Sequence, residues 1–251
     1  MSIDTIQKQR FEHKYVIPEK VSSGIRDFIS CYLDLDSYGA TQPNLSYPVH
    51  SIYLDSPTMR TYQETVNGDR NRYKLRIRYY EMSDEAPVYF EIKRRHDRII
   101  AKKRAIVHRR FARDLVRGFI PGTAGLVDPS SEQLDALLDF TRFVYQLNAE
   151  PKAHVSYLRE AWMADGANKI RVTMDRKVII EPQKRLNFST DLQNSQPVFG
   201  RNVILELKFT NRFPIWFREM VQIFGLQPGA AAKYVDGVSN TGEFRFIRSS
   251  V

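Results

Sequence analysis

Basic residues alternate with apolar ones in the run from Asn71 to Tyr80. In a strand, successive side chains point to opposite faces, so the basic residues would share one face. Like charges about 6.6 Å apart along that face repel one another by about 2.5 kcal/mol at an effective dielectric of roughly 20. Such a row is either a solvated surface or a site for a polyanion. Its members are Arg72, Lys74, Arg76 and Arg78.

The same alternation recurs in five other segments, and each has one apolar and one charged face. The charged faces are mostly basic, with a single Glu embedded in three of them. Lys103 lies between two basic residues of one segment and should face the opposite way. The charged residues concerned are Glu12, Lys14, Glu91, Lys93, Lys102, Arg104, Lys169, Arg171, Glu206 and Lys208.

Two arrangements account for these faces. An antiparallel sheet could turn its charged side to solvent, or a closed barrel could carry the charges in its lumen. Surface strands usually mix small polar residues and both charge signs, whereas these concentrate Arg and Lys, which favours the barrel. A basic lumen would focus a positive potential, and a few carboxylates there would suit a divalent cation that bridges to phosphate. We therefore expect an α+β fold: a closed antiparallel β tunnel barrel with a charged lumen and helices packed outside.

The composition agrees with an anionic partner. The 251 residues include 38 basic and 29 acidic ones, which gives a net charge of +9 and indicates nucleic acid, nucleotide, phosphate polymer or anionic lipid. The single cysteine, Cys31, cannot form an internal disulfide, which favours a reducing compartment. The N-terminal residues lack an apolar signal core, and no apolar run is long enough to span a membrane. We expect a cytoplasmic protein.

The expected elements run through the whole chain without a long linker, so we expect one domain over residues 1–251. Period-two patterns predict strands at residues 10–17, 49–55, 71–82, 87–95, 98–108, 153–163, 169–175, 177–181 and 202–210. Helical periodicity predicts helices at 18–35, 109–120 and 132–147, a short helix after Pro57, and another from Pro214 to about Gly225.

The ordered set of strand motifs resembles the VTC domain, the polyphosphate polymerase module of the vacuolar transporter chaperone complex and its bacterial relatives. That family belongs to the triphosphate tunnel metalloenzymes, together with CYTH-type triphosphatases and adenylate cyclases. The resemblance covers residues 8–240 and rests on the whole set more than on one motif. The motifs are RFEHKYVI (10–17), SIYLDS (51–56), NRYKLRIRYY (71–80), FEIK (90–93), KKRA (102–105), IRVTMD (170–175), LELK (205–208) and AKYVDG (232–237).

The resemblance implies a tunnel that binds triphosphate and transfers the γ-phosphate of ATP to a growing polyphosphate with Mn²⁺ or Mg²⁺. It implies a metal held by Glu206, helped by Glu12 or Glu91, and a catalytic set of Arg76, Arg78, Lys93 and Lys208. The implied phosphate-binding residues are Lys14, Arg76, Arg78, Lys93, Lys102, Arg104, Arg171, Lys208 and Lys233.

The chain departs from the polymerase pattern in two ways. Ala230 stands where the polymerase has a second basic residue, three positions before Lys233, and this puts polymer handling in doubt more than triphosphate binding. The partner domains and membrane helices of the yeast-type complex are missing, so any membrane association would need a membrane-protein partner.

Three other functions stay open. A triphosphatase would use water as the acceptor in the same tunnel. A non-catalytic module would bind polyphosphate or nucleotide without turnover. An RNA-binding protein would need the basic faces outside, and so nucleic acid is the disfavoured partner.

Overall fold

The computed structural model describes residues 11–97, 99–119, 122–164, 169–210 and 212–247. Arg10 and Arg98, each of which begins an expected strand, lie outside these ranges. The described chain forms two compact units, and each consists of segments that are distant in the sequence. No helix in the described ranges is long and apolar enough to cross a membrane, and the expected cytoplasmic location stays a prediction.

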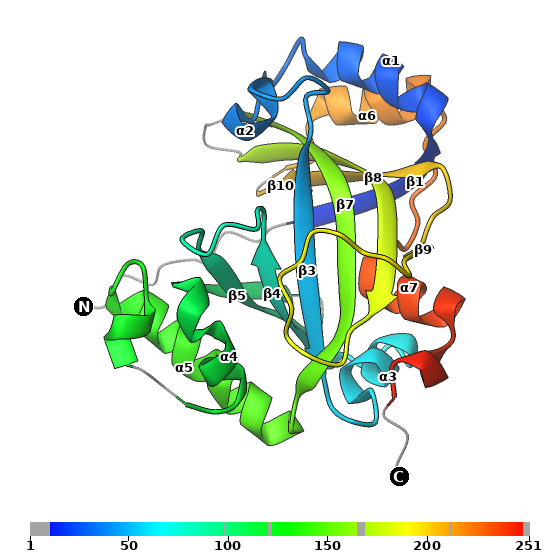
Figure 1. The fold of residues 1–251 in the computed structure, drawn as a ribbon. Coiled ribbons are helices and arrows are strands. Elements are labelled where there is room, and N and C mark those ends of the chain that lie inside the picture. The colour runs from blue at the N-terminus through cyan, green and yellow to red at the C-terminus, as the bar shows by residue number, and fades with distance from the viewer. Residues whose placement is uncertain (1–10, 98, 120–121, 165–168, 211, 248–251) are drawn as a thin grey trace, which may run out of the picture. The chain divides into compact units, whose positions relative to one another are not determined.

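Unit 1 comprises residues 1–47, 158–177 and 199–231. Helices α1 and α6 lie side by side in it (Figure 1), and the ring of Phe28 lies 6.5 Å from that of Trp216. Its core combines Ile25 and Ile29 of α1 with Leu205 and Leu207 of β10. The elements of this unit are β1 (Phe11–Pro18), α1 (Glu19–Ile29), β2 (Asp34–Leu35), α2 (Ser37–Ala40), β10 (Asn202–Phe209) and α6 (Ile215–Ile223).

Unit 2 comprises residues 48–157, 178–198 and 232–251. Its elements are β3 (Tyr47–Asp55), α3 (Arg60–Val66), β4 (Asn71–Tyr79), β5 (Val88–His96), β6 (Ile99–Val107), α4 (Ala112–Val116), α5 (Ser131–Leu147), β9 (Gln196–Pro197) and α7 (Lys233–Thr241), with 3-10 helices at Arg109–Phe111, Gly122–Gly125 and Glu243–Arg245. Strands β7 (Glu150–Ala164) and β8 (Ile170–Pro182) contribute residues to both units, as does β3, whose first residue, Tyr47, belongs to unit 1.

Helix α5 covers the apolar face of the β4–β6 strands in unit 2. The Ser130 side chain accepts a hydrogen bond from the Gln133 backbone N–H, which satisfies one of the free donors at the helix start. Asn148 ends the helix in the left-handed conformation. The apolar stripe of the helix then packs on the strands, with Phe140 4.8 Å from Phe90 in an edge-to-face contact.

The predicted alternation is confirmed in β4 and β6. Leu75, Ile77 and Tyr79 are fully buried against the α5 side. Lys103 lies on that same side, since its amino group forms an ion pair with Asp139 of α5. The residues on either side of Lys103 therefore belong to the opposite, charged face.

The predicted closed barrel is wrong. The strands form an open, 10-stranded antiparallel sheet in the order β1-β10-β8-β7-β3-β4-β5-β6, with β2 paired to β7 and β9 to β8. Alternation defines two faces of a sheet but does not require its edges to meet. Within the described residues the two edges are covered locally instead. The Val127 N–H donates to the carbonyl of Ile106 on β6, and the Gly229 N–H donates to the carbonyl of Lys14 on β1, both at 2.9 Å.

Several expected elements differ from the observed ones. The helix expected at 18–35 is α1, which ends at Ile29, and Asp34–Leu35 form β2. The helix expected at 109–120 is a 3-10 turn followed by the short helix α4. The strands expected at 169–175 and 177–181 are one strand, β8, in which Lys177 has a left-handed backbone with φ of 49°. The left-handed residue interrupts the period-two alternation, which is why the pattern suggested two strands. The strand nevertheless continues through it.

A buried histidine pair in unit 2 predicts acid sensitivity. His50 Nδ1 lies 3.1 Å from His154 Nε2, which also lies 3.1 Å from the Tyr79 hydroxyl. Burial lowers the pKa of His50 to about 4; burial and the charge of His50 lower that of His154 to about 3. Unfolded histidines take up protons below about pH 6.5, while the folded pair stays neutral, so stability is lost as the pH falls from that value.

We expect the free energy of unfolding to fall by about 2 kcal/mol or more between pH 6.5 and about pH 5. Denaturant titrations at several pH values measure it. The double variant His50→Asn/His154→Gln should show a flatter dependence, whereas His96→Gln, which changes an exposed residue, should keep the wild-type slope. Equal slopes in all three proteins would contradict the prediction.

Candidate functional site

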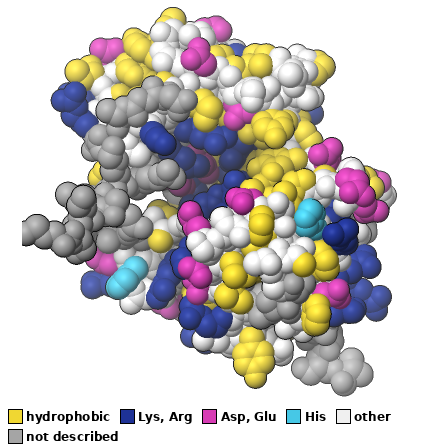
Figure 2. Space-filling view, turned by 90° about the vertical axis from the view of Figure 1, so that its left-hand side faces the viewer, with side chains coloured by type: hydrophobic (Ala, Val, Ile, Leu, Met, Phe, Trp, Pro, Cys, Tyr) yellow, Lys and Arg dark blue, Asp and Glu magenta, His cyan; other side chains and the backbone are white. Residues whose placement is uncertain are grey.

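Two sheet faces carry the residues that the sequence singles out. The β4–β6 basic face, in unit 2, consists of Lys74, Arg76, Arg78, Glu91, Lys93, Lys102 and Arg104. The β1–β10 charged face, in unit 1, consists of Glu12, Lys14, Arg171, Glu206 and Lys208. Figure 2 shows Lys and Arg side chains gathered on one face of the molecule, with Asp and Glu among them.

Strand register places like charges opposite one another on the β4–β6 basic face. Lys74 of β4 is opposite Lys93 of β5, and Lys93 is opposite Lys102 of β6. Directly opposed like charges destabilise a sheet. The folded chain nevertheless holds three lysines in one row across three strands. This face is therefore preorganised for a ligand that carries several negative charges.

The neighbouring row is built around the carboxylate of Glu91, which is 1% exposed. Its Oε2 accepts from Arg76 at 2.6 Å. Its Oε1 lies 2.7 Å from the Lys102 amino group and 2.6 Å from the Arg104 guanidinium group. One carboxylate thus binds three cations from two neighbouring strands, and the face keeps an excess of positive charge.

This crowding perturbs two acid–base equilibria. Burial alone would raise the pKa of Glu91, but the charges of Arg76, Arg78, Lys102 and Arg104 outweigh it and hold that pKa well below its usual value. The pKa of Lys102 falls to about 7, chiefly because protein atoms replace water around its amino group. Arg104 and Arg76 lower it further, while Glu91 acts in the opposite direction. Lys102 keeps 39% of its side chain exposed, so a ligand can reach it.

Two tyrosines hold the central arginines and were missed by the sequence reasoning. Tyr53 of β3 is opposite Arg76, and its hydroxyl accepts from Arg76 at 3.4 Å. The hydroxyl of Tyr157 accepts from Arg78 at 3.2 Å. Burial would raise the pKa of Tyr53, but the charge of Arg76 and its hydrogen bond, with Arg78 and Lys233, lower it. The only signal available in the sequence was the place of Tyr53 within the strand motif SIYLDS.

Lys233 also belongs to unit 2, where its amino group lies 5.1 Å from the centre of the Tyr157 ring. A cation at this distance from an aromatic face is stabilised by the ring quadrupole. Tyr157 thus contacts both Arg78 and Lys233, two residues that the sequence analysis predicted to bind phosphate.

The β1–β10 charged face is built around Lys14 and Glu206, which are opposite each other. The Lys14 amino group lies 3.2 Å from Glu12 and 3.5 Å from Glu206. Lys208 lies 2.7 Å from Glu206, and Arg171, opposite Lys208, pairs with Asp36 at 3.3 Å. Unlike the β4–β6 basic face, this one balances its cations with nearby carboxylates.

The segment around Ala230 contacts Lys14 through its backbone. The Lys14 amino group donates to the Ala231 carbonyl at 3.0 Å, and the Lys14 carbonyl accepts from the Gly229 N–H. The side chain of Ala230 is exposed. The missing basic side chain therefore removes a charge from the segment beside Lys14 and leaves these two backbone contacts in place.

A buried ion pair on the same strand face was also missed. Arg159 of β7 donates two hydrogen bonds to Asp175 of β8, at 2.7 and 2.8 Å. Both residues adjoin a second charged residue in the sequence, Glu160 and Arg176 respectively. Two consecutive charges hide the alternation, so the period-two pattern gave no signal here.

A divalent metal fits part of the predicted acidic set. Among the described residues, no group of three or more His, Cys, Asp and Glu side chains is placed to hold a metal ion. Mg²⁺ needs only one or two carboxylates when phosphate and water supply the other ligands. Glu12 and Glu206 contact the same amino group and so form such a pair. Glu91 fits less well, because its two oxygens bind three basic side chains, whereas those of Glu206 contact two, Lys14 and Lys208.

Comparisons with solved structures find weak similarity. The PH1819 protein from Pyrococcus horikoshii OT3 shares 10% identity at a TM-score of 0.46, over 93% of this chain and 99% of that one. A chain of the Mediator head module of Schizosaccharomyces pombe shares 10% identity at a TM-score of 0.38, over 86% and 91%. Neither similarity indicates a function for this chain. A search among curated proteins gives no match.

The family comparison covers nearly the whole chain. The model of the VTC domain matches residues 9–241, a range that includes every residue of both charged faces. VTC domains are associated with polyphosphate polymerisation and polyphosphate metabolism. The match extends over far more than half of the sequence, and the chain therefore belongs to the VTC domain family.

Proposed function

We propose that this protein is a polyphosphate polymerase, which transfers the γ-phosphoryl group of ATP to the end of a growing polyphosphate chain. The observation that carries the proposal is the row Lys74–Lys93–Lys102, in which three like charges lie opposite one another in adjacent strands. A linear phosphate polymer carries closely spaced negative charges and complements such a row. Membership of the VTC family supports the same substrate class.

The reaction needs positioning and charge neutralisation more than covalent help from the protein. A terminal phosphate oxygen of the acceptor attacks the γ-phosphorus of ATP and forms a new phosphoanhydride bond. The bond between that phosphorus and the β–γ bridging oxygen breaks, and its electron pair leaves with ADP. We assign the binding of the transferred group to Arg76 and Arg78, because guanidinium groups make paired contacts with phosphate oxygens.

Within unit 2, Lys93, Lys102, Arg104 and Lys233 would bind the phosphates on either side of the transferred group. Within unit 1, Lys14, Arg171 and Lys208 would bind phosphate on their own sheet face. Lys93 and Lys208 would neutralise charge that develops during transfer. Lys and Arg residues in fixed strands cost little reorganisation when that charge appears.

Glu206 and Glu12 would hold the Mn²⁺ or Mg²⁺ ion. When bound, such an ion neutralises charge on phosphate oxygens and orients them. Glu91 has a different part in this proposal: it is the counter-ion that keeps Arg76, Lys102 and Arg104 together.

The proposal is tested by incubating the chain with ATP, a divalent metal and a short polyphosphate primer, and by measuring polymer, ADP and free phosphate. We expect polymer with an equal amount of ADP. Arg76→Gln and Glu206→Gln should lower turnover by at least 100-fold, about 2.7 kcal/mol, as for the loss of one charge-stabilising group. Lys103→Gln is the matched control and should keep wild-type activity, since Lys103 faces α5.

Other products would change the assignment. Free phosphate without polymer would mean that water is the acceptor and that the chain is a triphosphatase. Tight binding of polyphosphate without any product would reduce the function to that of a binding module.

A second prediction concerns the pH dependence of binding. A bound phosphate chain should raise the pKa of Lys102, which is about 7 in the free protein. Binding should therefore take up a proton, and the affinity for tripolyphosphate should fall as the pH rises above 7. Isothermal titration calorimetry in buffers of different ionisation enthalpy measures this uptake. Lys102→Gln should abolish it and Lys103→Gln should not; uptake that persists in Lys102→Gln would refute the assignment to Lys102.

A further inference from the structure

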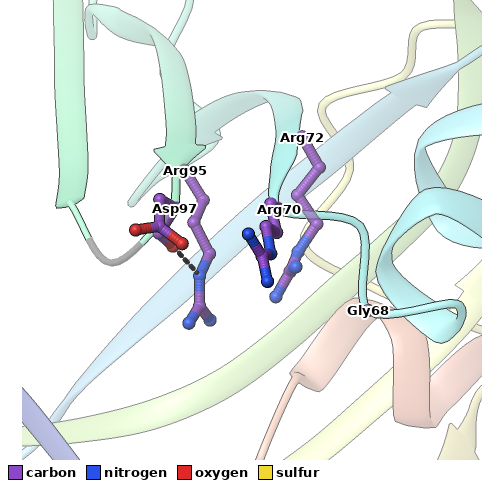
Figure 3. Close-up of a pocket in the computed structure, with 5 residues that line it drawn as sticks. All are labelled: Gly68, Arg70, Arg72, Arg95 and Asp97. Carbon is purple, nitrogen blue, oxygen red and sulfur yellow. Dashed lines mark hydrogen bonds between the residues drawn. The ribbon is translucent and has the colours of Figure 1, made fainter.

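A second basic site lies beyond the β4–β6 basic face, where β4 begins and β5 ends. A pocket of about 370 Å³ is present there, and all of its lining residues belong to unit 2. In Figure 3, the side chains of its three arginines lie side by side. The lining consists of Gly68, Arg70, Arg72, Arg95 and Asp97.

Backbone contacts fix the walls of this pocket. The Asp97 N–H donates to the Arg70 carbonyl at 2.9 Å, which ties the residues before β4 to the turn after β5. Asp97 has a left-handed backbone with φ of 53°, and its carbonyl accepts from Arg95 Nε at 2.8 Å (Figure 3). Arg72 donates to the Asp69 carbonyl. The guanidinium groups of Arg72 and Arg95 are thus oriented by carbonyl oxygens.

The pocket has an excess of positive charge. Its lining contains three arginines and a single carboxylate, that of Asp97. Among the described residues, no carboxylate lies within ion-pair distance of Arg70, Arg72 or Arg95. Arg72 and Arg95 are directly opposite each other in the strand register, which is an unfavourable arrangement for like charges. Burial and then the charge of Arg95 lower the pKa of Arg72, against the opposing effect of Asp69.

The pocket continues the row pattern of the basic face. The pair Arg72–Arg95 lies two residues along the strands from the pair Lys74–Lys93 and four from the Arg76–Glu91 pair. Four residues of strand span about 13 Å. A ligand that reaches from Arg76 to this pocket must therefore be extended and carry negative charge along its length. None of the described residues that line the pocket is aromatic, so these residues offer no stacking surface for a nucleic-acid base.

We propose that Arg70, Arg72 and Arg95 form a second phosphate-binding subsite, which holds the part of a long polyphosphate that extends past the β4–β6 basic face. The inference rests on the proposed function of that face. The subsite gives the protein a preference for long chains, because a chain bound at two places dissociates more slowly than one bound at a single place.

The test compares two double variants of the full chain with the same change in charge. Arg72→Gln/Arg95→Gln removes the opposed pair. Arg113→Gln/Arg185→Gln changes two exposed arginines of the same unit that do not line the pocket. Calorimetry at one fixed salt concentration, without metal, measures binding of tripolyphosphate and of long-chain polyphosphate. We expect the pocket variant to lose at least tenfold in affinity for the long chain and less than twofold for tripolyphosphate, with the control variant near wild type for both.

Each outcome separates the subsite from the proposed function. Equal long-chain affinity in the pocket variant and the wild type would overturn the subsite. Failure of the wild type to bind tripolyphosphate, together with a loss of long-chain affinity in the pocket variant, would keep the subsite and overturn the function proposed for the basic face. Single-stranded RNA is the third probe. If the wild type binds RNA as tightly as polyphosphate, and the pocket variant loses affinity for both to the same extent, the assignment to polyphosphate is wrong.

Folding of the variants is checked by thermal unfolding. Removing two opposed charges should leave the melting temperature unchanged or raise it. Arg70→Gln, at an exposed position, provides a second measurement if the double variant does not fold. It should lower long-chain affinity severalfold and leave tripolyphosphate affinity unchanged; a long-chain affinity equal to that of the wild type would overturn the subsite.

Discussion

The ion pairs of Glu91 are the interaction on which the β4–β6 basic face depends. Without this carboxylate, Arg76, Lys102 and Arg104 would repel one another, since Lys102 and Arg104 both lie within 2.7 Å of the same Glu91 oxygen. Buried ion pairs add little net stability, because desolvation of the charges offsets their attraction. The stability of this part of unit 2 therefore comes from the other face, where Leu75, Ile77 and Phe90 pack against α5. The apolar face of these strands thus stabilises the fold, and the charged face is available to a ligand.

Charge is distributed differently on the two faces. The β1–β10 charged face has carboxylates beside its cations: Glu12 and Glu206 contact Lys14, Glu206 contacts Lys208, and Asp36 contacts Arg171. The β4–β6 basic face sets three cations on Glu91 and three lysines in one row. A near-balanced face with two adjacent carboxylates is the better place for a cation, and the strongly basic one is the better place for phosphates.

The sequence predicted what depends on local periodicity. Alternation placed Arg76 and Lys102 on one face and Leu75 and Lys103 on the other, and the register confirms this. Closure of the sheet could not be predicted, since it depends on what covers the edge strands: Val127 covers β6 and Gly229 covers β1. The roles of Tyr53 and Tyr157 depend on strand neighbours that are distant in sequence. The Arg159–Asp175 pair was not predicted, because the residue after Arg159 is also charged: Glu160 points to the opposite face of β7 and binds Arg26 and Arg176.

The backbone contacts of Lys14 affect how mutational data on this protein should be read. The segment from Pro228 to Ala231 fixes Lys14 through two main-chain groups, and it offers no side chain larger than a proline ring. Alanine scanning changes almost nothing in such a segment and would score it as unimportant. The length of the segment is what matters, since the loss of one residue would shift both groups. Insertions and deletions, which scans usually omit, are the changes that would reveal its contribution.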